Sequence, residues 1–278
     1  MKKLLCAALL VGLFAGAAPA WTIGTLAKMN ATEAEYGERS PLNYTNTTGK
    51  LIRDMLLAEG LNRKEVPAVK FYDSQMAMQL GLNRGEVDAI VAPDFVGEYI
   101  LRNAPEYCLK GFFLLKRQIA IAIGFSEERA ELCKRFDEAL KALTENGMTS
   151  HLARYYLSGP EAENPQPVAF DKFEGAETVN VLVTGDIPPL DYVDAGGTPA
   201  GYNTALLAEL GRWLHVNINL VSSESGTRVA ALTSGRVDAV FWIEIMPDGK
   251  QFDKPEGVLV TRPYYGWSKV FLIGVKGK

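Results

Sequence analysis

Three acidic residues follow short apolar runs, and their placement could bring carboxylates to one edge of a sheet. Asp94 follows the run 88–93, Asp186 follows 179–185, and Glu244 follows 239–243. In open α/β sheets, ligands bind beyond the carboxyl ends of the strands. A carboxylate at that position pairs with the ammonium group or the hydroxyl groups of a ligand. The alternative is that each acid caps the helix or loop after it, and Asp94 in particular begins a helix expected at 94–103.

Two nearly identical segments indicate how such strands are arranged. Residues 85–91 read GEVDAIV and residues 235–241 read GRVDAVF, each after a helical apolar pattern. A Gly just past a helix supplies a left-handed stop, and a β-branched apolar run is typical of a strand buried on both faces. Each copy therefore predicts a helix–turn–strand unit of a parallel α/β sheet. Two copies predict two similar sheets, and hence two lobes.

The alternation of helical and strand patterns divides the chain. Residues 21–125 carry one α/β unit, and residues 126–158 carry two helices, the first with Ser126 as its N-cap. Residues 159–178 are rich in proline and have little periodic pattern, as in a linker or a strap along the surface. The α/β alternation restarts at 179–278 and ends in a strand at 269–275.

Residues 1–20 predict export. Lys2 and Lys3, an apolar stretch and the small-residue exit at 18–20 form a secretory signal that is cleaved after Ala20. No later segment is apolar for long enough to span a bilayer, so we expect a soluble protein of the periplasm. The net charge of −4 over 278 residues, without a basic run, argues against nucleic acid as a partner.

Motifs for cofactors and metals are missing from the sequence, which has no C-x-x-C, H-E-x-x-H or phosphate-loop pattern. We therefore expect neither a cofactor nor a metal site. Cys108 and Cys133 could form a disulfide in an oxidising compartment or remain two core thiols, and the sequence leaves both possibilities open.

Several stretches resemble one protein family. VTGDIPPLDYVDAGGTPAGYNTALLAELGRWL, LTSGRVDAVFW and TRPYYGWSKVFLIGV resemble the first lobe of type II periplasmic solute-binding proteins. The group in question is the amino-acid (polar solute) ABC-transporter family, bacterial extracellular solute-binding protein family 3. TIGTLAKMNATEAEY, FYDSQMAMQLGLNRGEVDAIVAPDFVGEYIL and FDEALKALTENGMTSHLARYYL resemble its second lobe and closing helices. The resemblance implies an α/β fold with two lobes, each built on an open mixed sheet, joined by a hinge.

The order of these segments differs from that of the family, in which the first lobe comes first. The resemblance therefore implies a circular permutation, with 21–125 as the second-lobe unit and 126–158 as closing helices that pack on the later lobe. After the linker, 179–278 would be the first-lobe unit and would end in the hinge strand. The alternative is a tandem of two degenerate binding domains, but the stretch before the linker is short for two lobes.

The resemblance implies a monomeric periplasmic receptor, not an enzyme. It would capture a small polar solute, an amino acid or a related amine-bearing compound, between its lobes for the membrane permease of an ABC transporter. Two alternatives stay open. One is a dehydratase-like or lyase-like enzyme on the same scaffold with Asp94 or Glu244 as acid or base, and the other is a sensor domain that has lost transport.

The amino-acid pocket of the family is only partly matched. Its ammonium-binding Asp corresponds to Pro93, one residue before Asp94, and its helix acid corresponds to Ala205, close to Asn203. Its T-x-x-R clamp for the ligand carboxylate falls on IMPDGK, which ends in Lys250.

Other groups could replace the missing arginine. Lys250 and Arg228 carry positive charge, and the helix N-terminus at Asn30–Thr32 offers free backbone N–H groups for an anion. Four aromatic residues in the same segments either stack on a ligand or belong to the core. The expected ligand-binding residues are Asp94, Asp186, Glu244, Trp242, Asn30, Thr32, Tyr192, Tyr202, Asn203, Arg228, Lys250 and Tyr264. Because the acids outnumber the cations, we expect ligands with an ammonium group or many hydroxyls rather than dicarboxylates.

Overall fold

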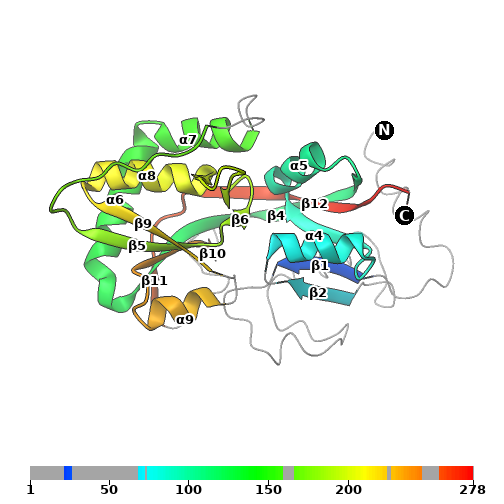
Figure 1. Ribbon diagram of the computed structural model, residues 1–278, viewed down its shortest axis with the longest axis horizontal. Coiled ribbons are helices and arrows are strands. Elements are labelled where there is room, and N and C mark those ends of the chain that lie inside the picture. The colour runs from blue at the N-terminus through cyan, green and yellow to red at the C-terminus, as the bar shows by residue number, and fades with distance from the viewer. Residues whose placement is uncertain are drawn as a thin grey trace. The chain divides into compact units, whose positions relative to one another are not determined.

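The structure, a computed structural model, describes residues 22–26, 68–72, 74–158, 166–223, 227–245 and 257–277, without the side chains at 68, 113, 115–117 and 244. The chain has a mixed α/β fold and divides into two compact units. Unit 1 comprises Met1–Lys116 with Lys269–Lys278, and unit 2 comprises Arg117–Ser268. Strands β4 (Tyr107–Ser126) and β12 (Tyr265–Val275) each pass from one unit into the other (Figure 1).

Unit 1 is built on parallel strands. Its other strands and its helices are β1 (Thr22–Leu26), β2 (Ala68–Tyr72), α4 (Gln75–Asn83), β3 (Ala89–Pro93) and α5 (Asp94–Asn103). The strand order is β2-β1-β3-β12, in which β1 is parallel to β2 and β3, and β12 is antiparallel to β3. Helix α4 begins at a capping serine, whose hydroxyl accepts a hydrogen bond from the Ala77 N–H: the distance from Ser74 Oγ is 3.0 Å.

Unit 2 repeats this strand pattern. Its main strands are β5 (Thr178–Val183), β9 (Asn217–Ser222), β10 (Ala239–Ile245) and β11 (Val258–Val260). Its helices are η1 (Glu127–Arg129), α6 (Ala130–Glu145), α7 (Met148–Ala153), η2 (Arg154–Ser158), α8 (Tyr202–Leu214) and α9 (Arg228–Thr233). The order β9-β5-β10-β4, with β4 antiparallel to β10, has the same form as β2-β1-β3-β12 in unit 1. In each unit, the first of three parallel strands (β1 or β5) therefore lies between the other two. The fourth, antiparallel strand (β12 or β4) comes from a segment distant in the sequence.

The repeated segments form the same turn in both units. Gly85 follows α4 with φ 72°, and Gly235 follows α9 with φ 70°, so both occupy the left-handed region that ends a helix. The acid of each copy then joins the neighbouring parallel strand. The Asp88 carboxylate accepts a hydrogen bond from Thr22 N (2.6 Å), and that of Asp238 accepts one from Asn180 N (2.8 Å). The predicted helix–turn–strand units are thus confirmed at both places.

The residues between β4 and β5 form helices and an irregular segment on the outside of unit 2. Helices α6 and α7 both pack against α8 (Figure 1). Residues 166–177 have no regular structure but are fixed along the surface. Asn217 accepts a hydrogen bond from Phe173 N (2.8 Å) and donates one to Phe173 O (2.9 Å), and the Phe173 ring lies 4.1 Å from that of His215. The described residues 166–177, here called the strap, are therefore held along the surface of unit 2.

Two local features differ from what the sequence indicates. The Pro-rich and Gly-rich segment after β5 forms a small antiparallel sheet of β6 (Asp186–Ile187), β7 (Asp191–Val193) and β8 (Pro199–Ala200). Strands of this length contain too few residues to show a period-2 pattern. Ser126 makes no side-chain capping bond, because the 3₁₀ turn η1 separates it from α6.

Three further properties concern only the described residues. No helix among them is both long enough and apolar enough to cross a bilayer. No three of their His, Cys, Asp or Glu side chains are grouped as metal ligands would be. Cys108 and Cys133 lie in different units and are both free thiols.

Candidate functional site

A buried carboxylate organises the carboxyl end of β5 in unit 2. The Asp191 side chain, 2% exposed, accepts hydrogen bonds from the backbone N–H of Gly185 (2.8 Å) and from the Thr184 hydroxyl. Its other oxygen accepts one from Asn203 Nδ2 at 2.7 Å. Because Asn203 lies in the first turn of α8, Asp191 fixes the residues that follow β5 against the start of that helix.

Two polar atoms in this region are buried without a well-formed hydrogen bond. They are Asn203 Oδ1 and the hydroxyl oxygen of Tyr264. Asn203 is fully buried, and its backbone N–H donates to Leu190 O at 2.8 Å. A buried polar atom of this kind costs about 1–3 kcal/mol, so it marks a position with a role beyond packing or a place for water.

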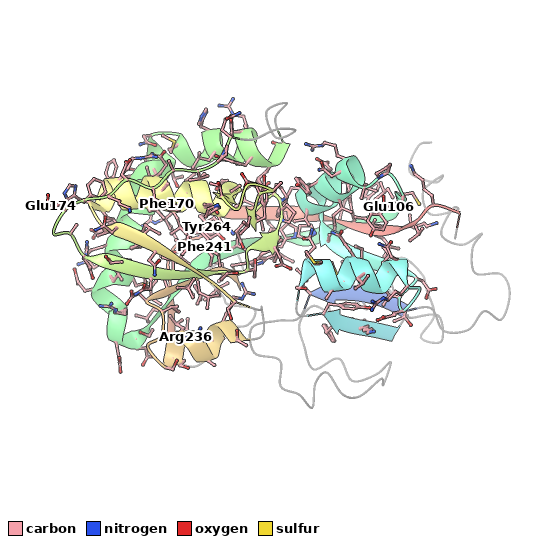
Figure 2. All side chains as sticks on the ribbon, viewed as in Figure 1. Glu106, Phe170, Glu174, Arg236, Phe241 and Tyr264 are labelled. Atoms are coloured by element: carbon pink, nitrogen blue, oxygen red, sulfur yellow. The ribbon has the colours of Figure 1, made fainter. Side chains whose placement is uncertain are left out.

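Aromatic side chains fill the space beside this frame. The ring of Tyr264 lies 5.2 Å from that of Phe241 (Figure 2). It lies 6.1 Å from the ring of Tyr202. The Tyr202 hydroxyl donates to Tyr264 O at 2.9 Å. Burial raises the pKa of Tyr202 well above its usual range. It raises the pKa of Tyr264 too, with the Asp191 carboxylate adding to the effect and the Trp242 backbone amide opposing it. Both phenols therefore stay protonated at neutral pH.

Arg228 brings a positive charge to the middle of β10. It begins α9 and is 5% exposed, and its Nη1 donates to Phe241 O at 2.9 Å. A guanidinium group stays charged even when it is buried. The arrangement therefore favours a negative group near this part of β10.

Trp242, the residue after Phe241, has a strained backbone. Its φ is 63°, a value that costs a residue other than glycine about 1–3 kcal/mol, and it lies where the register of β10 on β4 shifts. Its ring packs edge-to-face on Trp267 at 6.3 Å. Strain of this kind within a strand is often found at functional sites, because it orients a side chain that a regular strand would point elsewhere.

Asp186 and Tyr192 face each other as a pair in the small sheet. Asp186 is half-buried just beyond the carboxyl end of β5, where the sequence predicts it. Tyr192 lines a cavity of about 150 Å³ that also contacts Val183 and Leu220. The two residues are therefore neighbours in the sheet, and only Tyr192 contributes to the cavity wall.

Asp94 is the predicted acid of unit 1. It begins α5 directly after β3, and its Oδ1 accepts a hydrogen bond from Phe95 N at 3.0 Å. Burial raises the pKa of the Asp94 carboxyl, against the hydrogen bond from Phe95 and the charge of Lys269. The carboxylate bonds within the first turn of α5 but does not cap the helix, because the N-cap is Pro93, and it is half-buried.

The predicted residues are distributed unevenly over the structure. Unit 2 brings together Tyr202, Asn203, Arg228, Trp242 and Tyr264, through the contacts given above. Asn30, Thr32, Lys250 and the side chain of Glu244 lie outside the described part of the chain.

The sequence reasoning missed two groups. Asp191 and Thr184 were not singled out, because an acid in PPLDYV shows no sign of its burial until the tertiary structure supplies three donors. The second group is Asp88 and Asp238, whose carboxylates bond to a neighbouring strand. This role could have been recognised, because both copies of the repeated segment have an acid at the same position.

Comparison with known proteins relates part of the chain to one family. Residues 179–274 match the model of the bacterial extracellular solute-binding proteins, family 3, which is less than half of the chain. A comparison with curated protein sequences gave no match.

Solved structures with a similar course of the chain include two transport proteins. One is the ligand-binding component of an ABC-type import system from Staphylococcus aureus, solved with zinc bound. It has a TM-score of 0.45 and 10% identity, over 94% of this chain and 67% of that one. The other is an ABC transporter periplasmic binding protein from Brucella ovis with glutathione bound. It has a TM-score of 0.45 and 12% identity, over 93% of this chain and 63% of that one.

Proposed function

We propose that this protein is a receptor for a small polar solute, acting outside the cytoplasm for an ABC transporter. The observation that carries the proposal is the family match at residues 179–274. This stretch runs from β5 into β12, and it contains the Asp191 frame, the buried Arg228 and the strained Trp242. The role is binding rather than catalysis, and export follows from the signal expected at residues 1–20.

We assign the solute contacts in unit 2 to Asp186, Arg228 and Trp242. Asp186 lies just beyond the carboxyl end of β5, where ligands of open α/β sheets bind, and Arg228 and Trp242 lie at the irregular middle of the neighbouring strand β10. Tyr202 and Tyr264 are buried core groups that hold these strands in place. Asp94 is the candidate contact of unit 1. Glu244, Lys250, Asn30 and Thr32 stay predictions, as does capture of the solute between two lobes.

The solute carries an ammonium group or several hydroxyls. A carboxylate that loses water on binding costs several kcal/mol unless donors or a cation replace the water. Asp94 and Asp186 are half-buried, and a ligand ammonium or hydroxyl would supply that compensation. Arg228 could hold the carboxylate of an amino acid, so a zwitterion also fits.

The order of the units agrees with a circular permutation of the family's arrangement. Unit 1 starts the chain and also contains its end, whereas the family match begins only at residue 179 in unit 2. The strap 166–177 would then bridge the positions at which an unpermuted chain begins and ends.

Calorimetric titration against amino acids, polyamines, sugars and organic acids tests the proposed function. We expect a binding hit among the ammonium-bearing or hydroxyl-rich compounds. Asp186→Asn and Asp94→Asn should each weaken that hit roughly ten- to hundredfold, the effect of losing a hydrogen bond to a charged group. Asp171→Asn is the matched control, because this exposed carboxylate pairs only with Arg212 on the surface.

Two results would refute this assignment. One is tightest binding to glutamate or aspartate, and the other is unchanged affinity in both variants. Chemical turnover of the hit would instead support an enzyme.

A further inference from the structure

The cavity of unit 2 lies between the small sheet and the ends of two strands of the large one. Val183 and Leu220 line it from β5 and β9, and Val193 and Pro199 line it from β7 and β8. Its volume is about 150 Å³. This is about the volume that a benzene-sized molecule occupies in an apolar cavity, although the space is partly open to solvent, because Val193 and Ser222 in its wall are exposed. The space therefore fits one small ring.

Gly185 keeps one side of this space open. Its φ of 73° is left-handed, and a Cβ at this position would come within 2.8 Å of Ser222 Oγ. Glycine is thus required for the backbone conformation and for the space beside Ser222. Any other residue at position 185 would therefore reduce the space of the cavity.

The polar groups of the wall are mostly engaged. The Thr204 hydroxyl donates to Ala200 O at 2.9 Å, and the Ser222 hydroxyl donates to Thr184 O at 3.1 Å. Asp191 already accepts three hydrogen bonds. Because both hydroxyl protons point into the protein, these two groups offer a ligand only acceptor lone pairs.

These properties of the cavity wall favour an uncharged ligand over a charged one. An anion would meet the Asp191 carboxylate and two hydroxyls whose protons are already used. An ammonium ion would gain little from Asp191, whose two oxygens already accept three hydrogen bonds, and would lose part of its hydration against a wall that is largely apolar. An uncharged ring loses little and buries apolar surface.

We propose that this cavity is a second ligand site, which takes an uncharged molecule of about one six-membered ring with a single hydroxyl or N–H donor. The apolar ring contacts Val183, Val193 and Leu220, and the donor bonds to Ser222 Oγ or to Asp191. The site is separate from the proposed solute contacts, because neither Asp94, Asp186, Arg228 nor Trp242 lines the cavity.

Phenol, benzene, benzoate and benzylamine are the probes that test this site. Each is titrated into the isotopically labelled chain while the backbone amide signals of Val183, Thr204 and Leu220 are followed by NMR. We expect phenol to shift these signals and to bind roughly fivefold more tightly than benzene, because it adds one hydrogen bond. Benzoate and benzylamine should bind more weakly than either.

Two variants locate the effect. Leu220→Trp fills the cavity and should weaken phenol binding about tenfold or more. Asn219→Trp is the matched control, since it places the same side chain on the exposed face of the same strand and should leave phenol binding unchanged. Ser222→Ala should lower the affinity for phenol to that for benzene without affecting benzene, and it tests the site even where Leu220→Trp does not fold.

The proposal fails if phenol shifts none of the three signals, if Leu220→Trp binds phenol as well as the original chain, or if a charged probe binds most tightly. A solute identified by calorimetry should still bind the Leu220→Trp variant. Failure of this site is therefore distinguishable from failure of the receptor function.

Discussion

Asp191 shows how much a single carboxylate contributes once it is buried among donors. Its three hydrogen bonds come from Thr184 and Gly185, which follow β5, and from Asn203 in the first turn of α8. Each of these groups needs an acceptor, because a buried donor without one costs about 1–3 kcal/mol. The carboxylate thus fixes the end of β5 and the first turn of α8 in one step.

Asp191→Leu should therefore destabilise unit 2 strongly. The leucine has a similar size but leaves three buried donors without an acceptor, so we expect a loss of about 3 kcal/mol in the free energy of unfolding. Guanidinium denaturation measures this loss. Asp171→Asn, on the exposed strap, should change the same quantity by less than about 0.5 kcal/mol. A loss in Asp191→Leu as small as in this control would show that the frame is not needed for stability.

A second acid provides a pH-dependent contribution. Burial tends to raise the pKa of Asp137, but its hydrogen bonds from Arg262 outweigh this and the pKa is lowered from 3.8. Arg262 Nη2 donates to Asp137 Oδ2 at 2.7 Å, and its backbone N–H and Nε bond to Oδ1. The pair joins α6 to the residues after β11.

The sign of this effect follows from the lowered pKa. Stability from Asp137 is present at pH values above 3.8 and is lost as the pH falls through the lower pKa of the folded state. Asp137→Asn should cost about 1 kcal/mol at neutral pH, because the pair is partly exposed, and should flatten the acid dependence of unfolding below that value. Denaturation midpoints from pH 7 to pH 2 measure both. An acid limb identical to that of the original chain would contradict the prediction.

The sequence predicted the position of Asp186, but not which of the predicted residues are accessible. Asp186 lies just beyond β5, as the sequence places it. Tyr202 and Asn203 have the chemistry of ligand contacts, yet both are fully buried in the first turn of α8. Burial depends on which elements pack together, and the local pattern of apolar residues does not contain that information.

At the scale of elements, the two helix–turn–strand segments differ in their surroundings. Asp238 is 7% exposed and accepts bonds from Arg129 Nε (2.8 Å) and Asn180 N (2.8 Å). Asp88 is exposed and accepts one from Thr22 N. Water can replace the lost acceptor at the exposed turn but not at the buried one.

Equal substitutions at these turns should therefore have unequal effects. Asp238→Ala should cost about 2–3 kcal/mol of unfolding free energy, and Asp88→Ala about 0.5–1 kcal/mol. Chemical denaturation of the two variants beside the original chain gives both values. Equal losses, or a larger loss at Asp88, would contradict the role of burial in this turn.

Elements with strong local signals were predicted well and those defined by tertiary contacts were not. Helix α4 has its Ser74 cap and its left-handed Gly85, so its start and end could be recognised. Strands β6–β8 contain only two or three residues each and depend on Asp191 and on packing against β5 and α8. The hydrogen bonds that hold the strap join it to residues of β9 and α8 that are far away in the sequence, so no local sequence pattern predicts them.

At the scale of the molecule, both units use one strand order, and in unit 1 two segments far apart in sequence reach the same end of the sheet. Ile273 of β12 pairs with Ile90 of β3, and Ile90 pairs with Gly24 of β1. Because β12 is antiparallel to β3 and β1 is parallel to it, Thr22 and Val275 lie at the same end of the sheet. Two strand spacings separate them, about 10 Å.

A chain in the opposite order should therefore fold. We expect a variant that begins at Gln166, continues to residue 277, passes through a flexible linker of about four residues to the segment starting at Thr22, and ends at Ser158. All strand pairs are kept, and the new ends lie where the strap begins. Its circular dichroism should match that of the original chain, with a free energy of unfolding within about 2 kcal/mol. A matched control opened between Ile121 and Ala122 breaks the pairing of β4 with β10 and should not fold. If the first variant is as unfolded as this control, the permuted arrangement is refuted, because its two old ends could not have been joined.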